Sequence, residues 1–342
     1  MWVISMKLFV TGGAGFIGSN FVRHSVSKGH KVTVVDKLTY SGNLDNIRDL
    51  DQKSYEFIHA DICDESLMRT GMKNADAVVH FAAESHVTRS ETDPEVFYRT
   101  NVEGTRTLLK CATETGVKKF VHISTDEVYG SRPDGLFQES DKLIGDSQAS
   151  SPYSKSKSLA DDLAMSYSSM IPLIVVRPTN NFGPRQYPEK ALPRWVTRLL
   201  TGKNIPVWGK GENVRDWLHV GNTVKAIEFL IERGRAGEAY NIAANNKPEI
   251  RNIDIANWLI ETLRFDPARI EFVPDPRPNH DFRYAIDTRK IHSLGFTMDQ
   301  DVRKLVEETV NWYVENRAWW TRLLDGAESI YSDIKDNKGK RA

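Results

Sequence analysis

A tyrosine and a lysine four residues apart form the first reactive pair in this sequence. Tyr153 and Lys157 begin a segment with helical periodicity, so their side chains share one face. A phenol of pKa about 10 is a poor base at neutral pH, and a nearby ammonium lowers that pKa. A tyrosinate could take the proton of an alcohol while a hydride acceptor oxidises the carbon, and Thr125 could bind the same oxygen. Because Tyr-x-x-x-Lys is common on helix surfaces by chance, this interpretation depends on the surrounding segments.

Two adjacent carboxyl groups would add a further step. Asp126 and Glu127 follow the apolar run 120–123, which predicts a buried strand. Oxidation of an alcohol to a ketone acidifies the neighbouring C–H. One carboxylate could remove that proton while a carboxylic acid protonates a departing hydroxyl, and each such step contributes roughly 10²–10⁴ in rate. Adjacent strand residues point to opposite faces, so we expect the chain to turn before this pair. The alternative is two solvated loop carboxylates.

A glycine-rich turn precedes both clusters. Residues 11–18 read Thr-Gly-Gly-Ala-Gly-Phe-Ile-Gly, between a predicted strand and a predicted helix. Gly12 would allow the sharp turn, and Gly18 would let the helix pack close to the strand. Gly13 or Gly15 would let the backbone approach a pyrophosphate, which the free N–H groups of the helix would bind.

An acidic residue closes the next predicted strand. Asp36 lies about 20 residues beyond the glycines, where a carboxylate would hold a ribose diol. Strand, glycines, helix, strand and acid in this order predict a dinucleotide site, with Asp61 and Ile62 near the adenine. The charge of Asp36 should repel a 2′-phosphate and favour NAD over NADP, although neighbouring Lys37 weakens that inference.

The remaining apolar runs predict alternating strands and helices in the first half of the chain. This alternation predicts an α/β fold with a doubly wound, Rossmann-type parallel sheet, in which ligands gather at the carboxyl ends of the strands. The loop 131–151 is long enough to be a functional lid. Strands are expected at 7–11, 31–36, 55–59, 77–81, 120–123 and 173–176, and helices at 16–28, 94–115 and 153–170.

After Pro178 the predicted elements become short and mixed. Residues 1–178 would form an NAD-binding Rossmann domain that carries the catalytic residues. Residues 179–342 would mainly form a smaller, mixed α/β substrate-binding domain, with some chain crossing back. The elements expected there are a small hairpin within 205–219, a helix at 223–233 capped by Asn222, a strand at 238–242, and helices at 253–264 and 302–313.

The composition limits the class of protein. The 342 residues are 40% hydrophobic with a net charge of zero and no long single-sign block, so nucleic acid is not an expected partner. No run approaches the roughly 18 apolar residues of a membrane helix, and residues 1–5 are too short for a signal peptide. The cysteines and histidines show no metal-ligand spacing, so we assign no metal. We expect a cytoplasmic protein.

Two arginines are candidates for binding a nucleotide diphosphate. Arg215 and Arg277 could each bind phosphate oxygens in bidentate fashion. The alternative for each is an ordinary surface arginine.

Nearly the whole chain resembles the nucleotide-sugar 4,6-dehydratases of the extended short-chain dehydrogenase/reductase family. Thr-Asp-Glu at 125–127 together with Pro-Glu-Lys at 188–190 is specific to the dehydratase branch. The other segments that carry the resemblance are 11–18, 82–87, 128–130, 153–157, 180–184, 215–217 and 280–284.

The resemblance implies a reaction on a nucleotide sugar with NAD as cofactor. Tyr153, supported by Thr125 and Lys157, would deprotonate the sugar 4-hydroxyl while NAD⁺ takes the C4 hydride. Glu127 would then remove the C5 proton, and Asp126 would protonate the departing C6 hydroxyl. Return of the hydride to C6 would leave a 4-keto-6-deoxy sugar and regenerate NAD⁺.

The resemblance also implies two sets of binding residues. The residues expected to contact NAD are Gly12, Gly15, Phe16, Ile17, Gly18, Asp36, Lys37, Leu38, Thr39, Asp61, Ile62, Phe81, Ala82, Ala83, Ser85, Thr100, Tyr153, Lys157 and Asn181. Those expected to contact the nucleotide sugar are Ser85, Thr125, Asn180, Glu189, Lys190, Leu192, Pro193, Pro206, Val207, Trp208, Arg215, Asn246, Arg277 and His280.

Three positions depart from the residues usual in that family. Asn222 stands where an aspartate is usual, although asparagine would preserve a helix cap. Asn279 replaces a glycine, and Pro276 replaces an aspartate. These changes bear on the identity of the base (thymidine or uridine) and of the sugar more than on the type of reaction. The resemblance further implies a homodimer formed through helices that contain 103–115 and 158–170.

Two other interpretations stay open. An epimerase or decarboxylase of the same superfamily would share the fold, but a small residue is expected there at one of the two acidic positions. A non-catalytic NAD-binding sensor usually lacks the tyrosine or the lysine, whereas this sequence has both Tyr153 and Lys157. The mass of the product separates the reactions, because dehydration removes one water and epimerisation removes nothing.

Overall fold

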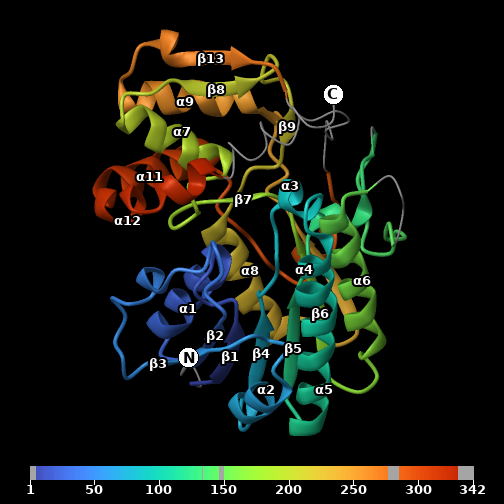
Figure 1. The fold of residues 1–342 in the computed structure, drawn as a ribbon. Coiled ribbons are helices and arrows are strands. Elements are labelled where there is room, and N and C mark those ends of the chain that lie inside the picture. The colour runs from blue at the N-terminus through green and yellow to red at the C-terminus, as the bar shows by residue number, and fades with distance from the viewer. Residues whose placement is uncertain (1–4, 133, 146–149, 276–284, 330–342) are drawn as a thin grey trace.

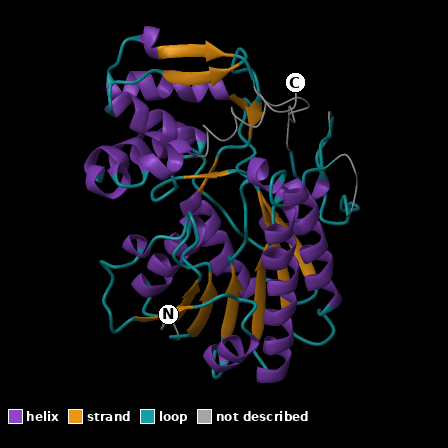
Figure 2. Cartoon of the chain, viewed as in Figure 1, coloured by secondary structure: helices purple, strands orange, loops and turns teal. Residues whose placement is uncertain are grey.

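The computed structural model describes residues 5–132, 134–145, 150–275 and 285–329. Its centre is a parallel sheet of seven strands in the order β11-β6-β5-β4-β1-β2-β3 (Figures 1 and 2). The order reverses between β1 and β4, as in a doubly wound sheet, which confirms the predicted Rossmann-type α/β fold. The strands are β1 (Lys7–Thr11), β2 (Lys31–Asp36), β3 (Tyr55–His59), β4 (Ala77–His80), β5 (Lys119–Ile123), β6 (Leu173–Pro178) and β11 (Glu238–Ile242).

Helices cover both faces of this sheet. Leu8 and Val10 of β1 pack into one core, whereas Phe9 between them packs into the other. Because neighbouring strand residues point to opposite faces, a strand covered on both sides is buried at every position, as β4 and β6 are. The first core includes α1 (Phe16–Ser27) and α8 (Val220–Arg233), and the second includes α2 (Glu65–Met72), α5 (Thr105–Thr115) and α6 (Pro152–Ser166).

The predicted helix at 94–115 contains a π-helical segment. Arg99–Gly104 joins α4 (Pro94–Tyr98) to α5 with a wider helical turn. Asn101 in this segment is buried, and it binds the backbone of Glu84 twice. Its Oδ1 accepts from Glu84 N at 2.9 Å, and its Nδ2 donates to Glu84 O at 3.0 Å. The π-helical segment thereby holds the loop that follows β4.

A second body packs around its own apolar core, next to the carboxyl ends of the strands (Figure 1). The buried tryptophans Trp319 and Trp320 belong to this core, so they serve packing. Strand β11 and helix α8 come from beyond residue 178 and complete the first body. The second body contains α7 (Ala191–Leu200), β8 (Ile205–Trp208), α9 (Asn252–Leu263), β13 (Ile270–Val273), α11 (Val302–Glu315) and α12 (Arg317–Thr321).

Residues 205–219 do not form the predicted hairpin. Gly209 and Gly211 have φ values of 59° and 70° and turn the chain away from β8, whose partner is the distant β13. The prediction was wrong because each of the three short strands in this segment pairs with a strand from another part of the chain. The other two pairs are β9 (Val214–Arg215) with β12 (Ile250–Arg251), and β10 (Leu218–His219) with β7 (Asn181–Phe182).

Asn222 is not a helix cap, contrary to the prediction. Helix α8 begins at Val220, and His219 caps it with Nδ1 accepting from Gly221 N at 3.1 Å. Asn222 lies inside the first turn, where its Nδ2 donates to Asp299 O at 2.7 Å. The side chain therefore joins α8 to a later segment of the chain.

The remaining short helices are η1 (Leu44–Asn46), α3 (Val87–Ser90), η3 (Asp126–Tyr129), η4 (Pro267–Arg269) and α10 (Arg289–Ser293). Within the part of the chain that the structure describes, none of the helices has the length and apolar character needed to cross a bilayer.

Candidate active site

The acid–base pair lies on a short 3-10 turn at the carboxyl end of β5. Thr125 still has extended backbone angles, and its hydroxyl accepts from Glu127 N at 3.3 Å. The turn η3 begins at Asp126, so the strand ends before the pair, as the sequence analysis required. The two carboxyl groups are therefore not forced to opposite faces of the sheet.

The environment of Asp126 keeps it protonated. Its side chain is buried, and burial followed by the charge of Glu127 raises the pKa of Asp126 to about 8. The carboxyl of Asp216 raises this pKa further, whereas the hydrogen bond that Thr125 Oγ1 donates to Asp126 Oδ1 at 3.1 Å opposes the shift. Asp126 thus carries its proton at neutral pH, which is the form that a general acid needs.

Glu127 is tied to the first turn of α6. Ser154 Oγ donates to Glu127 Oε2 at 2.9 Å. Ser154 Oγ also lies 3.0 Å from the hydroxyl of Ser151, the N-cap residue of the helix. A hydrogen bond to the charged form of a carboxylate stabilises that form, so Ser154 favours an ionised Glu127. The two adjacent carboxyl groups therefore have different surroundings.

Tyr153 and Lys157 are both buried on the face of α6 that lies against η3 and β5. The side chain of Thr125 lowers the pKa of Tyr153, against the larger effect of burial, which raises it. Lys157 Nζ donates to Ile123 O at 2.8 Å, and burial lowers the pKa of Lys157 to about 8. Burial and then the charge of Glu127 raise the pKa of Tyr153, opposite to the lowering expected from Lys157 alone. Burial is the largest cause of this shift, and the charges of Glu127 and Asp126 add to it.

A buried ion pair that the sequence analysis missed supports the acid–base turn. Arg177 binds both oxygens of Asp161, with Nε and Nη2 at 2.9 and 2.8 Å. Its Nη1 also donates to the hydroxyl of Tyr129, the last residue of η3, at 2.7 Å. That hydroxyl in turn donates to Asn241 Oδ1 at 2.7 Å. The sequence signal for this ion pair was Arg177, a single charged residue inside the apolar run 173–178. A guanidinium buried in such a strand needs an acidic partner.

A second buried chain of hydrogen bonds joins the glycine turn to the π-helical segment. Thr105 Oγ1 donates to Asn101 O at 2.6 Å, so it accepts from His80 Nε2 at 3.0 Å. Thr11 Oγ1 can then donate to His80 Nδ1 at 2.8 Å. Burial lowers the pKa of His80 to about 3, which keeps the imidazole neutral for this arrangement.

The glycine turn fits a dinucleotide. Gly12 has a φ of 69°, and a Cβ there would come within 2.5 Å of Ala82 N. A Cβ on Gly18 would overlap the carbonyl of Gly12. Helix α1 begins at Phe16 without a side-chain cap from Gly15, so its first N–H groups are available to a pyrophosphate.

The acid at the end of β2 fits the ribose of NAD. Asp36 is buried and accepts hydrogen bonds from Ala14 N at 3.0 Å and Leu38 N at 2.8 Å. Lys37 Nζ donates to Asp61 Oδ2 at 2.8 Å, and Arg99 Nη2 lies 3.7 Å from the same oxygen. Asp61 therefore pairs with Lys37, the cation that weakened the preference for NAD in the sequence analysis.

The other residues expected to contact NAD lie at or just beyond the carboxyl ends of the strands. Thr39 follows β2, Ile62 follows β3, and Phe81, Ala82, Ala83 and Ser85 follow β4. Ile17 lies in the first turn of α1, and Thr100 lies in the π-helical segment. Asn181 lies in β7, where its Oδ1 accepts from Thr223 Oγ1 at 2.6 Å.

The residues expected to contact the nucleotide sugar lie mostly on the second body and its connections. Leu192, Pro193 and Val207 are buried, so these residues expose little or no surface to a ligand. Glu189 is also buried and pairs with Lys190, Nζ to Oε1 at 3.2 Å. Arg277 and His280 lie outside the described residues. The partly exposed or exposed members are Asn180, Lys190, Pro206, Trp208, Arg215 and Asn246.

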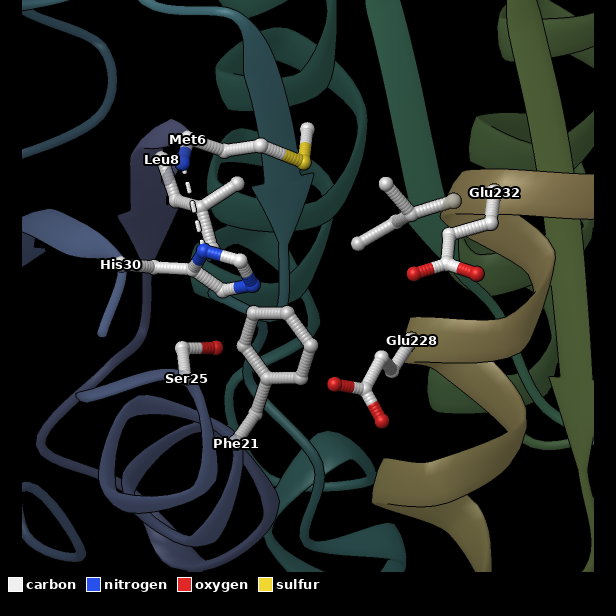
Figure 3. Close-up of a pocket in the computed structure, with 8 residues that line it drawn as sticks. Met6, Leu8, Phe21, Ser25, His30, Glu228 and Glu232 are labelled. Carbon is white, nitrogen blue, oxygen red and sulfur yellow. Dashed lines mark hydrogen bonds between the residues drawn. The ribbon is translucent and has the colours of Figure 1, made fainter. Parts of the chain in front are cut away.

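A small pocket lies elsewhere, between β1, α1 and α8 (Figure 3). His30 Nδ1 accepts there from Met6 N at 3.2 Å, and Glu228 and Glu232 line the opposite wall. The pocket is at the amino end of β1, away from the residues described above, and it holds none of them.

Comparisons with known proteins place the chain in a family. Residues 8–243 match the model of the NAD dependent epimerase/dehydratase family. The chain is 44% identical over 337 residues to a dTDP-glucose 4,6-dehydratase of Streptomyces niveus, covering 96% of this chain and 98% of that protein. It is 40% identical to dTDP-glucose 4,6-dehydratase 1 of Escherichia coli K12, covering 94% and 96%.

Solved structures of dehydratases and epimerases are similar to this chain over nearly its whole length. The dTDP-glucose 4,6-dehydratase DesIV of Streptomyces venezuelae, solved with NAD bound, has a TM-score of 0.86 at 42% identity and is covered over its full length by 93% of this chain. A UDP-glucose 4-epimerase of Thermotoga maritima has a TM-score of 0.81 at 28% identity, covering 91% and 99%. With a matched family model, relatives along nearly its whole length and a glycine turn shaped for a dinucleotide, the chain belongs to the NAD-dependent epimerase/dehydratase family.

Proposed function

We propose that this protein is a nucleoside-diphosphate-glucose 4,6-dehydratase, with dTDP-glucose as substrate. The observation that carries the proposal is the protonated Asp126 beside Glu127, on a turn that Ser154 joins to the helix of Tyr153 and Lys157. The dTDP-glucose dehydratases among its relatives, matched along nearly their whole length, support the thymidine base and the glucose. The product is the 4-keto-6-deoxy sugar.

The first step is oxidation at C4. Tyr153 takes the proton of the 4-hydroxyl, and the hydroxyl of Thr125, the residue before η3, binds the same oxygen. Lys157 lies four residues after Tyr153 on α6, so both side chains lie on the same face of the helix. Its ammonium is held at the end of β5 by the bond to Ile123 O. The glycine turn and Asp36 would hold NAD⁺, which would supply the hydride acceptor for C4 and, once reduced, the hydride donor for C6.

The second step is loss of water across C5 and C6. Glu127, whose ionised form Ser154 supports, removes the C5 proton that the C4 ketone has acidified. Asp126, which burial keeps protonated, gives its proton to the departing C6 hydroxyl. Two neighbouring carboxyl groups with different protonation states fit an acid and a base, and an epimerase has no step for them.

The test is a turnover assay with a panel of dTDP-glucose, UDP-glucose and their 2-acetamido forms, with products weighed by mass spectrometry. We expect a product lighter by one water from dTDP-glucose, with no net consumption of NAD. A product of unchanged mass would favour the epimerase, and net formation of NADH would favour a simple dehydrogenase. A Tyr153→Phe variant as active as the wild type would exclude the tyrosinate role.

We also propose a homodimer formed through the helices that contain 103–115 and 158–170, and a cytoplasmic location. The family resemblance supports the dimer, and the composition supports the location. Sedimentation of the purified protein tests the dimer, and a monomer at micromolar concentration would contradict it. Cell fractionation tests the location.

A further inference from the structure

Tyr129, the last residue of the acid–base turn η3, is fixed to the central sheet by its hydroxyl. Its Oη accepts from Arg177 Nη1 at 2.7 Å and donates to Asn241 Oδ1 at 2.7 Å. Arg177 and Asn241 are both buried, and they are paired in register on the neighbouring strands β6 and β11. Burial raises the pKa of Tyr129 to about 12, so the phenol stays neutral and keeps its proton for the bond to Asn241. The turn that carries Asp126 and Glu127 is therefore anchored to two strands just after its two carboxyl groups.

The ring of Tyr129 is also held by the long loop that follows η3. Phe137 stacks on this ring, with centroids 5.1 Å apart and an angle of 10° between the planes. The carbonyl of Phe137 accepts from Asn241 Nδ2 at 3.2 Å, and Glu139 Oε1 accepts from Asn241 N at 3.0 Å. Glu139 O accepts from Arg177 Nη1 at 3.1 Å. The two buried residues that bind the hydroxyl of Tyr129 therefore also bind the loop.

The far end of this loop returns to the turn. Ile144 N donates to Val128 O, inside η3, at 2.8 Å. Gly145 N donates to Ser158 Oγ, on α6, at 2.9 Å. The length of the loop suggested a functional lid, and its described residues 134–145 are bound to the turn and to the helix of the catalytic tyrosine.

A small apolar core joins the turn to the loop. It comprises Val128 and Tyr129 of the turn, Phe137 of the loop, and Ala243 and Ile286 from later in the chain. An isolated β-bridge between Phe137 and Ile286 adds backbone hydrogen bonds to this packing. The cluster is distinct from the apolar cores of the two bodies. The acid–base turn thus has a supporting core of its own.

The exclusion of water from Asp126 depends on where this turn lies. Asp126 is 2% exposed, and its Oδ1 accepts from Thr125 Oγ1, whereas its Oδ2 makes no hydrogen bond with the described residues. Burial is the largest cause of its raised pKa, so exclusion of water keeps the proton in place more than any hydrogen bond does. A turn released from the sheet would admit water to this carboxyl, which would then ionise nearer its ordinary pKa of 3.8.

We propose that Tyr129, Asn241 and Phe137 are positioning residues that hold the acid–base turn on the sheet and keep water from Asp126. This inference rests on the proposed function for the catalytic roles of Asp126 and Glu127. Tyr129 and Asn241 fix the turn through one buried hydrogen bond, and Phe137 packs the loop against it. The three residues act through the turn and not on the sugar.

The hydroxyl is tested by Tyr129→Phe. We expect kcat at pH 8 to fall about three- to tenfold, the range of one lost hydrogen bond, with little change in the KM for dTDP-glucose. The alkaline fall of kcat should move to lower pH by up to about one unit, since one pKa unit corresponds to roughly the energy of a hydrogen bond. Tyr240→Phe is the matched control with an unchanged pH profile, because it removes the hydroxyl of another buried tyrosine on β11, bonded to Glu238 Oε2 at 3.0 Å. A Tyr129→Phe protein with the pH profile of the wild type would overturn the role of the hydroxyl.

The loop is tested by Phe137→Ala, with the exposed neighbour Leu136→Ala as its control. Loss of the stacked ring should move the alkaline fall of kcat in the same direction, whereas Leu136→Ala should leave it in place. Phe137→Leu keeps an apolar side chain in the small core and should give a smaller shift, and it decides the test if the alanine protein does not fold. Wild-type pH profiles in the folded Phe137 variants would overturn the role of the loop.

A second readout does not need turnover. Asp126→Asn should raise the Tm near neutral pH, because the asparagine has no proton to lose. In the Tyr129→Phe background this gain should be at most about half as large, because water then reaches the carboxyl. Equal gains in the two backgrounds would overturn the positioning role. If the wild type does not turn over dTDP-glucose, the proposed function fails, and this thermal cycle then decides the positioning role by itself.

Discussion

Ser154 Oγ lies 2.9 Å from Glu127 Oε2, so the residue after the proposed catalytic tyrosine holds the residue after the proposed acid. This bond couples α6 to the turn at the end of β5, and the bond from Lys157 Nζ to Ile123 O couples α6 to the strand itself. The groups proposed for oxidation at C4 and for elimination across C5 and C6 are therefore held together by contacts between two elements far apart in the sequence.

Replacing Ser154 by alanine should slow the elimination more than the oxidation. Glu127 would lose a hydrogen bond to its charged form, which is worth roughly tenfold or more in rate. Reduced cofactor should then accumulate during turnover, measured by stopped-flow absorbance, while overall kcat falls about tenfold. Ser166→Ala, at the other end of α6, removes a bond to Leu163 O and is the control. Equal rates in the two variants would show that Ser154 does not support the base.

The pKa of Asp126 predicts how activity depends on pH. Because this pKa is about 8, the proton needed by the departing hydroxyl is lost as pH rises through that value. Lys157, with a lowered pKa of about 8, loses its charge in the same range. We expect kcat to fall on the alkaline side of about pH 8, measured with saturating substrate and NAD. A rate that keeps rising well beyond that pH would contradict a protonated Asp126 as the acid.

Asp126→Asn should be inactive in elimination yet more stable than the wild type. The folded protein holds the Asp126 proton up to about pH 8, whereas an unfolded aspartate releases it near its ordinary pKa of 3.8. Wild-type stability therefore declines as pH rises between these values, and the asparagine does not titrate. We expect a Tm gain of at least about 2 °C for the variant near neutral pH, shrinking as pH falls toward 4. A variant that is less stable at every pH would refute the buried, protonated carboxyl.

Helix α12 is predicted to support cofactor binding. Trp319 Nε1 donates to Asn46 Oδ1 at 2.9 Å, and Asn46 Nδ2 donates to Ala14 O in the glycine turn at 2.8 Å. Trp319→Phe keeps the packing but loses the first bond, so we expect the NAD dissociation constant to rise by about two- to tenfold in calorimetry. Trp258→Phe, in α9, is the matched control. Equal NAD affinities in the two variants would separate α12 from the cofactor site.

Breaking the buried ion pair Arg177–Asp161 should destabilise the protein strongly, whereas replacing both partners by apolar residues should change its stability little. Removing one partner leaves a buried charge uncompensated, so Arg177→Met or Asp161→Leu alone should lower the free energy of unfolding by about 3–5 kcal/mol. The double variant should recover most of that loss, because two apolar side chains fill the site without a charge. Urea denaturation of the four proteins measures both effects. Additive losses in the double variant would contradict a direct pair.

Features that depend on local geometry could be predicted from the sequence. The glycine turn, the strands around it and the shared face of Tyr153 and Lys157 follow from backbone freedom and from the periods of strand and helix. The need for a turn before Asp126 followed from the same reasoning, and η3 begins there. The hairpin at 205–219 and the Asn222 cap were wrong because both assigned hydrogen-bond partners from neighbouring sequence. The actual partners are β13, β12 and β7 in one case and Asp299 in the other.

The sequence by itself determined the fold class, the dinucleotide turn and the set of reactive groups, because these depend on residue type and spacing along the chain. Only the tertiary structure decided which of those groups are protonated and which charges are paired. Burial and the neighbouring carboxylates keep Asp126 protonated, and Asp61 pairs with Lys37. A pKa or a hydrogen bond depends on distances through space and on the exclusion of water, and residue order alone specifies neither.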